Sequence, residues 1–449
     1  MTFLLGLAYL ALTPPFQVPD EPNHFLRAFQ ISQGSIRGVR QHDRTGGFLP
    51  ITVIQYVAFF YQHSSRPKIL TSYEEWRQNI RESCPLTASR LSEQAFVNFS
   101  NTVHYSPIPY LPQALGINLA KVLTRNTPEA LYLSRFLTLL ASVALLGAAF
   151  RLLAFSVRLR LTLFFLATLP MSLFLLASTS ADALTISLAL VTAALCIRLT
   201  QYWNDHLFIW LLIAAVLLSC CKTLYLLIPL AGLPAVWLAP RQRHLKVGAA
   251  ALLVGAAFLP GLAWTALTTS WTVSIRPDRF DFPLLQLHYV LEEPLTVMLV
   301  FFSALKKEFM GLWWNLIGVL GWLDTFLPQP VYKFYPLLLT LTAVTGISSQ
   351  EQERRSTWRA GLFAASLFLA STFLLLLTAY LAWNPVRAPY VKGLQGRYFL
   401  PLVPLLLFWL PPIFSLKEKR YRIFSSVVFL VWTYLTYLSV AALFHRYWG

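Results

Sequence analysis

The sequence predicts an all-α, polytopic integral membrane protein with about eleven transmembrane helices in a single domain over residues 1–449. Two observations predict this class. Of the 449 residues, 56% are hydrophobic and only 12% are charged, whereas soluble domains carry about 25% charged residues. Apolar runs near the ~20 residues that cross a bilayer also recur along the chain, with lysines and arginines between them.

The net charge of +17 does not indicate nucleic-acid binding, because membrane topology accounts for basic residues in short loops. The four cysteines are not at zinc-ligand spacing and predict no disulfide framework. Composition therefore leaves membrane lipid as an expected partner and argues against nucleic acid.

The first apolar run, residues 2–13, is shorter than a full span, and we interpret it as a transmembrane helix that starts upstream of Met1. Ten further runs predict the remaining spans. These runs cover residues 130–156, 161–178, 183–202, 206–221, 223–240, 247–268, 331–348, 360–381, 398–415 and 423–443.

Basic residues gather in alternate loops, which the positive-inside rule assigns to the cytoplasm. The amino terminus is then cytoplasmic, the carboxy terminus is outside, and two outer loops cover residues 14–128 and 269–330. A semi-apolar piece around 294–305 is expected to lie at the interface or re-enter the membrane. The basic residues are Arg151, Arg158, Arg160, Arg241, Arg243, Lys246, Arg354, Arg355, Arg359, Lys417, Lys419, Arg420 and Arg422.

The first outer loop is predicted to lie against the membrane with two interface helices, at about 22–33 and 112–123. Between them lies a charge-rich segment at 73–82 around Trp76. The spacing of apolar residues predicts the inner face of the first interface helix. That face carries Phe25, Ala28, Phe29 and Ser32, whereas Arg27 and Gln30 lie off it.

The chemistry is predicted to centre on residues 19–24, where Asp20, Glu21 and His24 follow the first apolar run between two prolines. Proline restricts its own backbone and that of the preceding residue, so both acids are held in a short stiff turn. Either acid alone is explained by capping of the following helix. The pair together with His24 favours a functional role at the membrane edge.

Further polar residues fall on the predicted outer face, and we expect them to converge with Asp20 and Glu21 on one cleft. Each has a simpler interpretation: Asp182 as a helix cap, Lys222 as a snorkelling lysine, and His104 with Tyr105 as interface residues. Arg397 runs against the positive-inside bias and favours a phosphate contact. The predicted substrate-binding residues are His104, Tyr105, Arg135, Asp182, Lys222, Asp324, Gln395, Arg397 and Tyr398.

This combination of residues predicts a reaction at a lipid–water boundary. A carboxylate takes a proton from an acceptor hydroxyl, while lysine and arginine neutralise a phosphate leaving group. That layout moves a sugar from a lipid phosphate. The acid pair is also able to hold a divalent cation, and the sequence leaves this alternative open.

The motifs together resemble an uncharacterised family of predicted bacterial polytopic membrane proteins, a domain of unknown function. The likeness covers almost the whole chain. It rests on residues 19–34, His104-Tyr105, Pro109-Tyr110-Leu111-Pro112, Pro170-Met171, Ser178, Asp182, Gly321-Trp322-Leu323-Asp324 and residues 395–401.

That family looks like distant kin of the type C (GT-C fold) glycosyltransferases, which use polyprenyl-phosphate-linked donors on the outer face. The resemblance implies that Asp20 or Glu21 is the catalytic base. Our own hypothesis adds His24 to these catalytic residues and gives His24 and His104 positioning roles. The resemblance also implies a polyprenyl-phosphate-linked sugar as co-substrate, a cell-envelope glycan or lipid as acceptor, and the bacterial inner membrane as location. The rival predictions are a transporter or flippase of lipid-linked glycan, and a non-catalytic envelope-assembly subunit in which Asp20 and Glu21 tolerate alanine.

Overall fold

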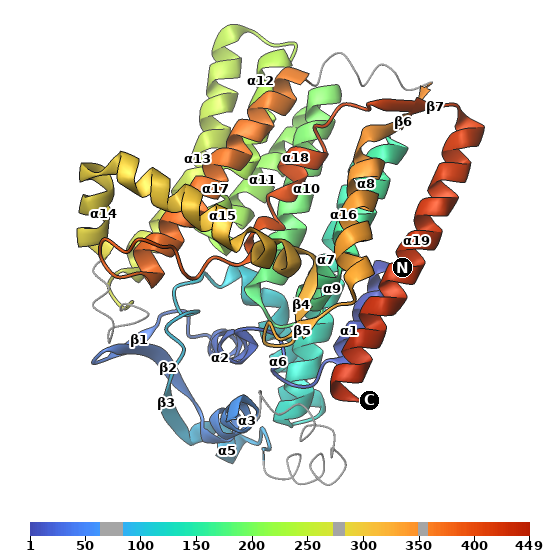
Figure 1. Cartoon of the computed structure of the whole chain (residues 1–449). Coiled ribbons are helices and arrows are strands. Elements are labelled where there is room, and N and C mark those ends of the chain that lie inside the picture. Colours follow the sequence, from blue (N-terminus) through green and yellow to red (C-terminus); the bar gives the residue numbers. More distant parts are fainter. Residues whose placement is uncertain (63–83, 273–282, 349–357) are drawn as a thin grey trace.

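The computed structural model describes residues 1–62, 84–272, 283–348 and 358–449. Within these ranges the chain is mostly helical. Figure 1 shows long helices above a smaller lower part that is formed largely by residues 14–128, which keep the name first outer loop from their predicted location. The predicted segment 73–82 and the loop residues Arg354 and Arg355 lie outside the described residues.

Five helices are long and apolar enough to cross a membrane, which confirms the predicted class of multi-pass helical membrane protein. A sixth candidate is the pair α8 (Val157–Ala167) and α9 (Pro170–Leu176), bent by 65°. Pro170 at the start of α9 explains the bend, because proline disfavours a helical conformation at Leu169. The five helices are α7 (Thr127–Leu152), α10 (Ala181–Gln201), α13 (Arg243–Thr268), α17 (Trp358–Trp383) and α19 (Glu418–Tyr447).

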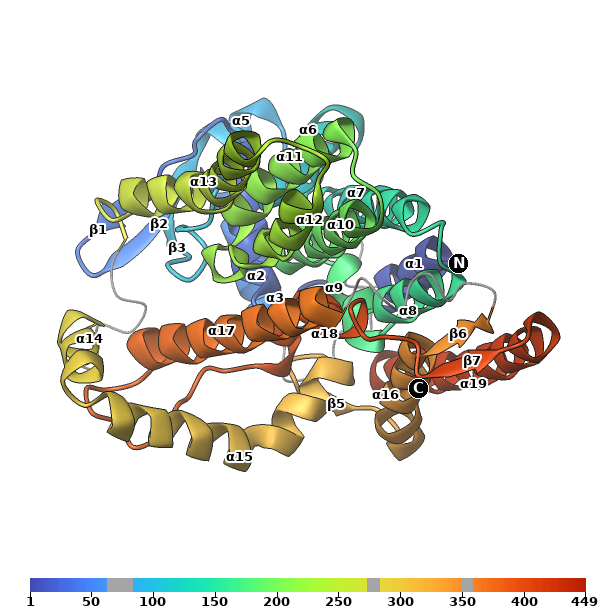
Figure 2. The same ribbon diagram turned by 90° about the horizontal axis from the view of Figure 1, so that it is seen from above.

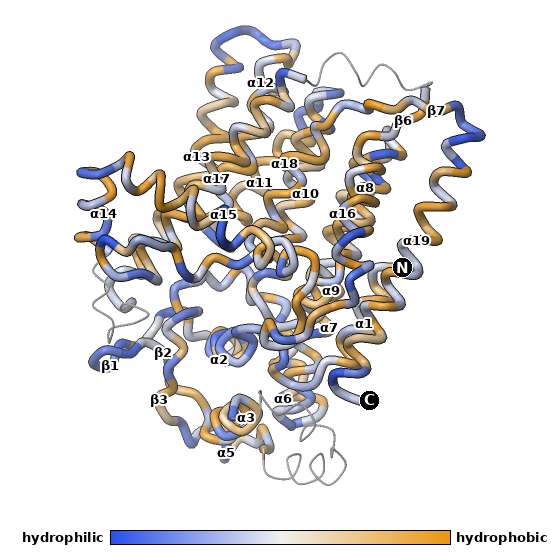
Figure 3. The backbone as a smooth tube through the Cα atoms, viewed as in Figure 1, coloured by the Kyte–Doolittle hydropathy of each residue, from blue (hydrophilic) through white to orange (hydrophobic). Residues whose placement is uncertain are grey.

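The central helix is α10, whose apolar stretch is 94% buried, compared with 22–39% for the other four candidates. It packs between α7 and α11 (Asp205–Cys221) on one side and α18 (Val403–Leu407) on the other (Figure 2). Figure 3 shows apolar residues along the long helices and polar residues at the upper ends of α13 and α19.

Several predicted spans form shorter or broken helices, so helix length supports five to six spans among the described residues rather than eleven. Run 223–240 contains prolines and forms η3 (Thr223–Tyr225), η4 (Ile228–Gly232) and α12 (Leu233–Leu238). Run 398–415 breaks in the same way. It forms η7 (Gly396–Phe399), the five-residue α18 and β7 (Phe414–Leu416).

Other apolar runs give single helices of limited length. These are α1 (Thr2–Leu12) and α16 (Gln329–Val344). The second outer loop contains α14 (Pro283–Glu292) and α15 (Pro294–Gly318), and α15 extends well past the semi-apolar piece predicted there. Short strands pair at two places between these helices. Strand β4 (Val319–Leu320) pairs with β5 (Thr325–Phe326), and β6 (Thr345–Ile347) pairs with β7.

The first outer loop contains both predicted interface helices, α2 (Glu21–Ser32) and α6 (Leu111–Leu123). It also contains an antiparallel sheet that the all-α prediction missed. Gly46 is required there, because a Cβ at this position would lie 1.8 Å from the Val97 carbonyl oxygen. The additional elements are β1 (Val39–Gln41), β2 (Arg44–Pro50), α3 (Ile51–Gln62), α5 (Ala88–Ser92), β3 (Gln94–Asn98) and η2 (Ile108–Tyr110).

Helix α2 is buried on both faces. Phe25 and Phe29 lie in a hydrophobic core that continues onto α7, as the spacing predicts. Arg27 and Gln30 are buried as well, because the following loop and the Tyr105 loop cover the other face. Arg27 Nη2 donates to the carbonyl of Tyr105 at 3.0 Å, and Gln30 Nε2 donates to that of Arg37 at 2.8 Å.

Candidate functional site

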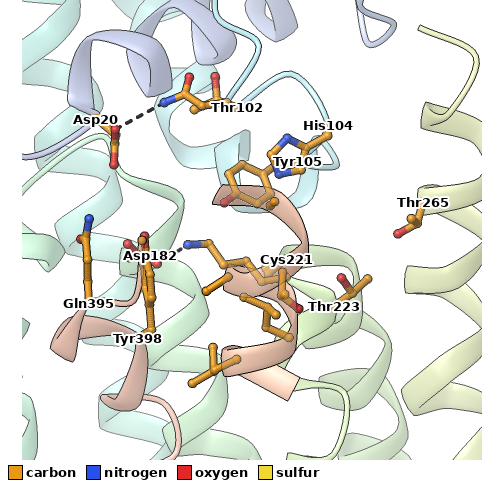
Figure 4. A pocket seen from close by; sticks show the side chains of 18 of the residues that line it. Asp20, Thr102, His104, Tyr105, Asp182, Cys221, Thr223, Thr265, Gln395 and Tyr398 are labelled. Atoms are coloured by element: carbon orange, nitrogen blue, oxygen red, sulfur yellow. Dashed lines mark hydrogen bonds and ion pairs between the residues drawn. The ribbon is translucent and has the colours of Figure 1, made fainter. Parts of the chain in front are cut away.

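A cavity of about 560 Å³ lies where the first outer loop meets the helices, and it collects most of the predicted site residues. Its walls come from the start of α2, the loop before η2, the start of α10, the α11–η3 turn, the ends of α13 and α17, and the loop before η7 (Figure 4). Nine of the twelve predicted residues line it: Asp20, His24, His104, Tyr105, Asp182, Lys222, Gln395, Arg397 and Tyr398.

Four charged residues form an alternating cluster in this cavity. Arg397 Nη2 lies 2.8 Å from Asp20 Oδ2, and Arg397 Nη1 lies 3.8 Å from Asp182 Oδ2. Lys222 Nζ lies 2.5 Å from Asp182 Oδ1. Two carboxylates and two cations therefore compensate each other's charge inside the protein.

Asp20 differs from the other three members of the cluster, because 39% of its side chain is exposed while theirs are 2–7% exposed. Its backbone adopts the left-handed conformation (φ 62°), which aspartate and asparagine tolerate better than most residues. The side chain makes no capping hydrogen bond to α2 and instead accepts one from Asn101 Nδ2 at 3.3 Å. Helix capping therefore does not explain Asp20.

Asp182 and Lys222 are also better explained by their pairing than by the simpler interpretations. Ser180 is the residue that caps α10, accepting a hydrogen bond from Asp182 N. The Lys222 ammonium lies 5.1 Å from the Tyr105 ring and 5.7 Å from the Tyr398 ring. Lys222 is thus held between two aromatic rings and a carboxylate instead of reaching to an interface.

Glu21 and Arg135 lie outside the cavity and form a sealed ion pair, with both side chains 0% exposed. Arg135 Nε and Nη2 donate to the two carboxylate oxygens at 2.8 and 2.6 Å. Arg135 also donates to the carbonyls of Thr13 and Pro14, and Thr179 N donates to Glu21. This pair joins the end of α1 to α2, α7 and the α9–α10 turn.

His24 and His104 are enclosed by aromatic residues. His24 Nδ1 lies 2.7 Å from the Tyr110 hydroxyl, and its ring stacks on Tyr105. Burial lowers the pKa of His24 to about 3 and that of His104 to about 4, so both imidazoles are neutral at pH 7. They fit the predicted positioning role better than that of a charged group.

Arg397 is fixed by α15, an arrangement that the sequence did not indicate. Arg397 N donates to Asn315 Oδ1 at 2.9 Å. A Cβ at Gly396 would lie 1.9 Å from the Leu312 carbonyl oxygen, so only glycine allows the loop to approach α15 this closely.

Other cavity residues were also missed by the sequence reasoning. Lys392 lines the cavity with an exposed side chain, and no carboxylate pairs with it within the described ranges. Trp264 Nε1 donates to the His104 carbonyl at 2.8 Å. Asn101, whose Nδ2 donates to Asp20, lies three residues before the His104-Tyr105 motif, and this motif was the only signal in the sequence near it.

Asp324 is the third predicted residue outside the cavity. Its carboxylate pairs with Arg446 of α19 and accepts a hydrogen bond from Thr325 at 3.1 Å. The neighbouring Trp322 Nε1 donates to the Phe16 carbonyl at 3.0 Å. This loop therefore joins the last helix to the α1–α2 turn.

The sequence left open a divalent cation held by the Asp20–Glu21 pair, but Glu21 pairs with Arg135 outside the cavity that Asp20 lines. Over the part of the chain that the structure describes, no three His, Cys, Asp or Glu side chains group closely enough to hold a metal ion. The two cavity carboxylates, Asp20 and Asp182, each pair with Arg397 instead.

The fold and site define a multi-pass helical membrane protein whose cavity contains a charge-compensated cluster of two carboxylates and two cations. Residues 3–406 match a family described as predicted membrane proteins (DUF2142). Because the match covers most of the chain, the protein belongs to this family. No curated protein and no solved structure matches the chain.

Proposed function

We propose that the protein is a membrane glycosyltransferase of the type C kind that moves a sugar from a polyprenyl-phosphate-linked donor to a cell-envelope glycan or lipid. The proposal includes the bacterial inner membrane, eleven spans, a cytoplasmic amino terminus and an outside carboxy terminus. The observation that carries it is Asp20, a partly exposed carboxylate paired with Arg397 in a cavity that Lys222 also lines. The starts of α13 and α19 hold basic residues and lie at the opposite end of the molecule from α2, the helix that Asp20 precedes (Figure 1).

Asp20 is the base in this proposal, and Glu21 is not. Glu21 accepts hydrogen bonds from Arg135 and Thr179 and has no exposed surface. Asp20 faces the cavity, and its carboxylate is in contact with one guanidinium and one amide. A general base must come within hydrogen-bond reach of the proton it takes, which only Asp20 is placed to do.

The proposed step conserves atoms and charge. The Asp20 carboxylate takes the proton of an acceptor hydroxyl while that oxygen bonds to the anomeric carbon of the sugar. The bond from this carbon to the phosphate oxygen breaks, and its electron pair leaves with the lipid phosphate. The phosphate gains one negative charge as Asp20 loses one.

The cations of the cavity supply the stabilisation that this charge transfer needs. Arg397 and Lys222 are fixed by neighbouring groups, so no reorganisation is required when charge develops on the phosphate. Lys392, which has no carboxylate partner within the described ranges, adds attraction for the incoming phosphate donor. Neutral His24 and His104 orient the surrounding wall.

The test is transfer of labelled sugar from a polyprenyl-phosphate donor pool into envelope glycan in membranes that contain the native protein or a variant. Asp20→Asn and Arg397→Gln are expected to lose transfer at unchanged membrane levels. The matched control is Asp205→Asn, which removes a carboxylate from the Arg241 ion pair at the far end of α11. Full transfer by Asp20→Asn would disprove the proposal, and translocation of lipid-linked glycan would then be measured with the same membranes.

A further inference from the structure

Two cations of the cavity, Arg397 and Lys222, already have their charge compensated. Arg397 contacts Asp20 and Asp182, and Lys222 contacts Asp182. The formal charges of these four groups sum to zero. An anion that enters therefore gains a full ion pair with Arg397 only if a carboxylate gives up its place.

The two carboxylates are not held equally. Asp182 is 7% exposed and contacts two cations, with Lys222 Nζ at 2.5 Å. Asp20 is 39% exposed and contacts one cation, with a long hydrogen bond of 3.3 Å from Asn101 as its other contact. Because exposed pairs are weak and buried pairs are costly to break, Asp20 is the carboxylate that an anion displaces.

Arg397 retains the donors that such an anion needs. A guanidinium carries five N–H donors, and the Nε of Arg397 has no hydrogen-bond partner within the described ranges. Its planar donor fork matches phosphate oxygens in a bidentate manner. The backbone of Arg397 stays fixed by Asn315 while the partner of its side chain changes.

We propose that the Asp20 carboxylate occupies the phosphate-binding position on Arg397, and that a phosphate ester binds by displacing it. This inference rests on the proposed function only for the polyprenyl carrier of that phosphate. Displacement frees the Asp20 carboxylate to accept a proton once the phosphate is bound. The phosphate donor then binds before the acceptor, and the base is released only when a phosphate group is bound.

Asp20→Asn is expected to bind a phosphate ester more tightly than the native protein does and yet to transfer less sugar. This variant removes the competing charge, and asparagine tolerates the left-handed backbone at this position. Its affinity for a phosphate ester should therefore rise about two- to tenfold, the range expected for loss of a partly exposed ion pair. Its transfer activity should fall, because the base is gone.

The experiment measures binding of a sugar-free polyprenyl monophosphate, and of inorganic phosphate in a separate arm, to purified protein in zwitterionic nanodiscs. The apolar wall of α17, with Leu375, Ala379 and Ala382, favours the lipid probe over the free ion. Expected results are tighter binding by Asp20→Asn, at least tenfold weaker binding by Arg397→Gln, and native binding by Asp205→Asn. Asp20→Ser, which also removes the charge, is the second variant if Asp20→Asn does not fold.

Native or weaker binding by the folded Asp20 variants would overturn the inference, as would equal tightening by Asp205→Asn. Binding of inorganic phosphate as tight as that of the lipid probe would retain the displacement and assign the site to a free phosphate. Tighter binding by Asp20→Asn with no transfer by the native protein would retain the displacement and reject the proposed glycosyltransferase. The two ideas therefore fail separately.

Discussion

Two acids that are neighbours in the sequence lie in opposite environments. Glu21 is sealed against Arg135 between four segments of the chain, whereas Asp20 faces a cavity and contacts Arg397. The left-handed backbone at Asp20 separates them, since Glu21 is the first residue of α2 and Asp20 lies just before it. A single turn thus provides one acid that holds the fold and one that is open to chemistry.

The sealed pair is expected to give the largest effect on stability. Removing one partner of a buried ion pair leaves an uncompensated charge, at a cost of about 3–5 kcal/mol. Glu21→Gln and Arg135→Gln should therefore lower the melting temperature in detergent strongly and reduce the amount of protein in the membrane. Scanning fluorimetry and quantitative membrane blots measure both effects.

The control for this prediction is Glu418→Gln, which makes the same change in the exposed ion pair with Arg422. It should cost less than about 1 kcal/mol. Equal melting temperatures for Glu21→Gln and Glu418→Gln would mean that the sealed pair contributes no more than a surface pair.

Substitution of Asp20, the acid that faces the cavity, should lower activity strongly and change stability little. Asp20→Asn removes the proposed base, and loss of general base catalysis lowers a rate by about 100-fold or more. Stability should change by less than about 1 kcal/mol, because the pair with Arg397 is partly exposed and asparagine keeps the backbone conformation. Transfer assays and melting curves on one preparation give both values, and unfolding of Asp20→Asn would remove the contrast between the two acids.

A smaller effect concerns pH and the neutral His24. Burial lowers the pKa of His24 to about 3 in the folded protein, from about 6.5 when unfolded. The unfolded chain therefore binds more protons between these values, so stability is full above pH 6.5 and falls as the pH drops towards 3. The loss should reach about 1 kcal/mol at pH 5.5.

Melting temperatures between pH 8 and 5 test this dependence. His24→Gln should reduce the decline below pH 6.5 by about half, whatever its effect on the absolute melting temperature, because His104, whose pKa burial lowers to about 4, contributes a similar part. His288→Gln, at an exposed position of α14, should keep the native decline. An unchanged pH profile in His24→Gln would show that other groups cause the decline.

Local sequence patterns correctly predicted part of the fold and part of the site. Run length predicted the five long apolar helices, and proline and glycine positions predicted α2 and α6. The alternation of basic loops predicted that the polar clusters share one face, and nine of the twelve chosen residues line one cavity.

Long-range pairing explains what the sequence could not predict. Arg135 joins Glu21 across 114 positions and Arg397 joins Asp20 across 377, and nothing local assigns each arginine to its acid. Strand β2 pairs with β3 beyond the intervening α3, and its glycines hide the alternation that indicates a strand. The length of an apolar run takes no account of the prolines within it. The predicted spans at 223–240 and 398–415 were therefore longer than the helices that form there.

The smallest expected effect separates the fixed cations of the cavity from its exposed one. Lys392→Gln removes a charge that no carboxylate balances within the described ranges, so donor affinity should fall about two- to fivefold while the rate at saturating donor is unchanged. Exposed charges are screened by salt, so this loss should shrink as ionic strength rises, whereas the loss in Arg397→Gln should persist because that guanidinium is 2% exposed.

The control is Lys307→Gln, which removes an exposed lysine of α15 outside the cavity. An equal loss in Lys307→Gln would assign the effect to overall charge, and a salt-independent loss in Lys392→Gln would place Lys392 with Arg397 among the groups that hold the phosphate during transfer.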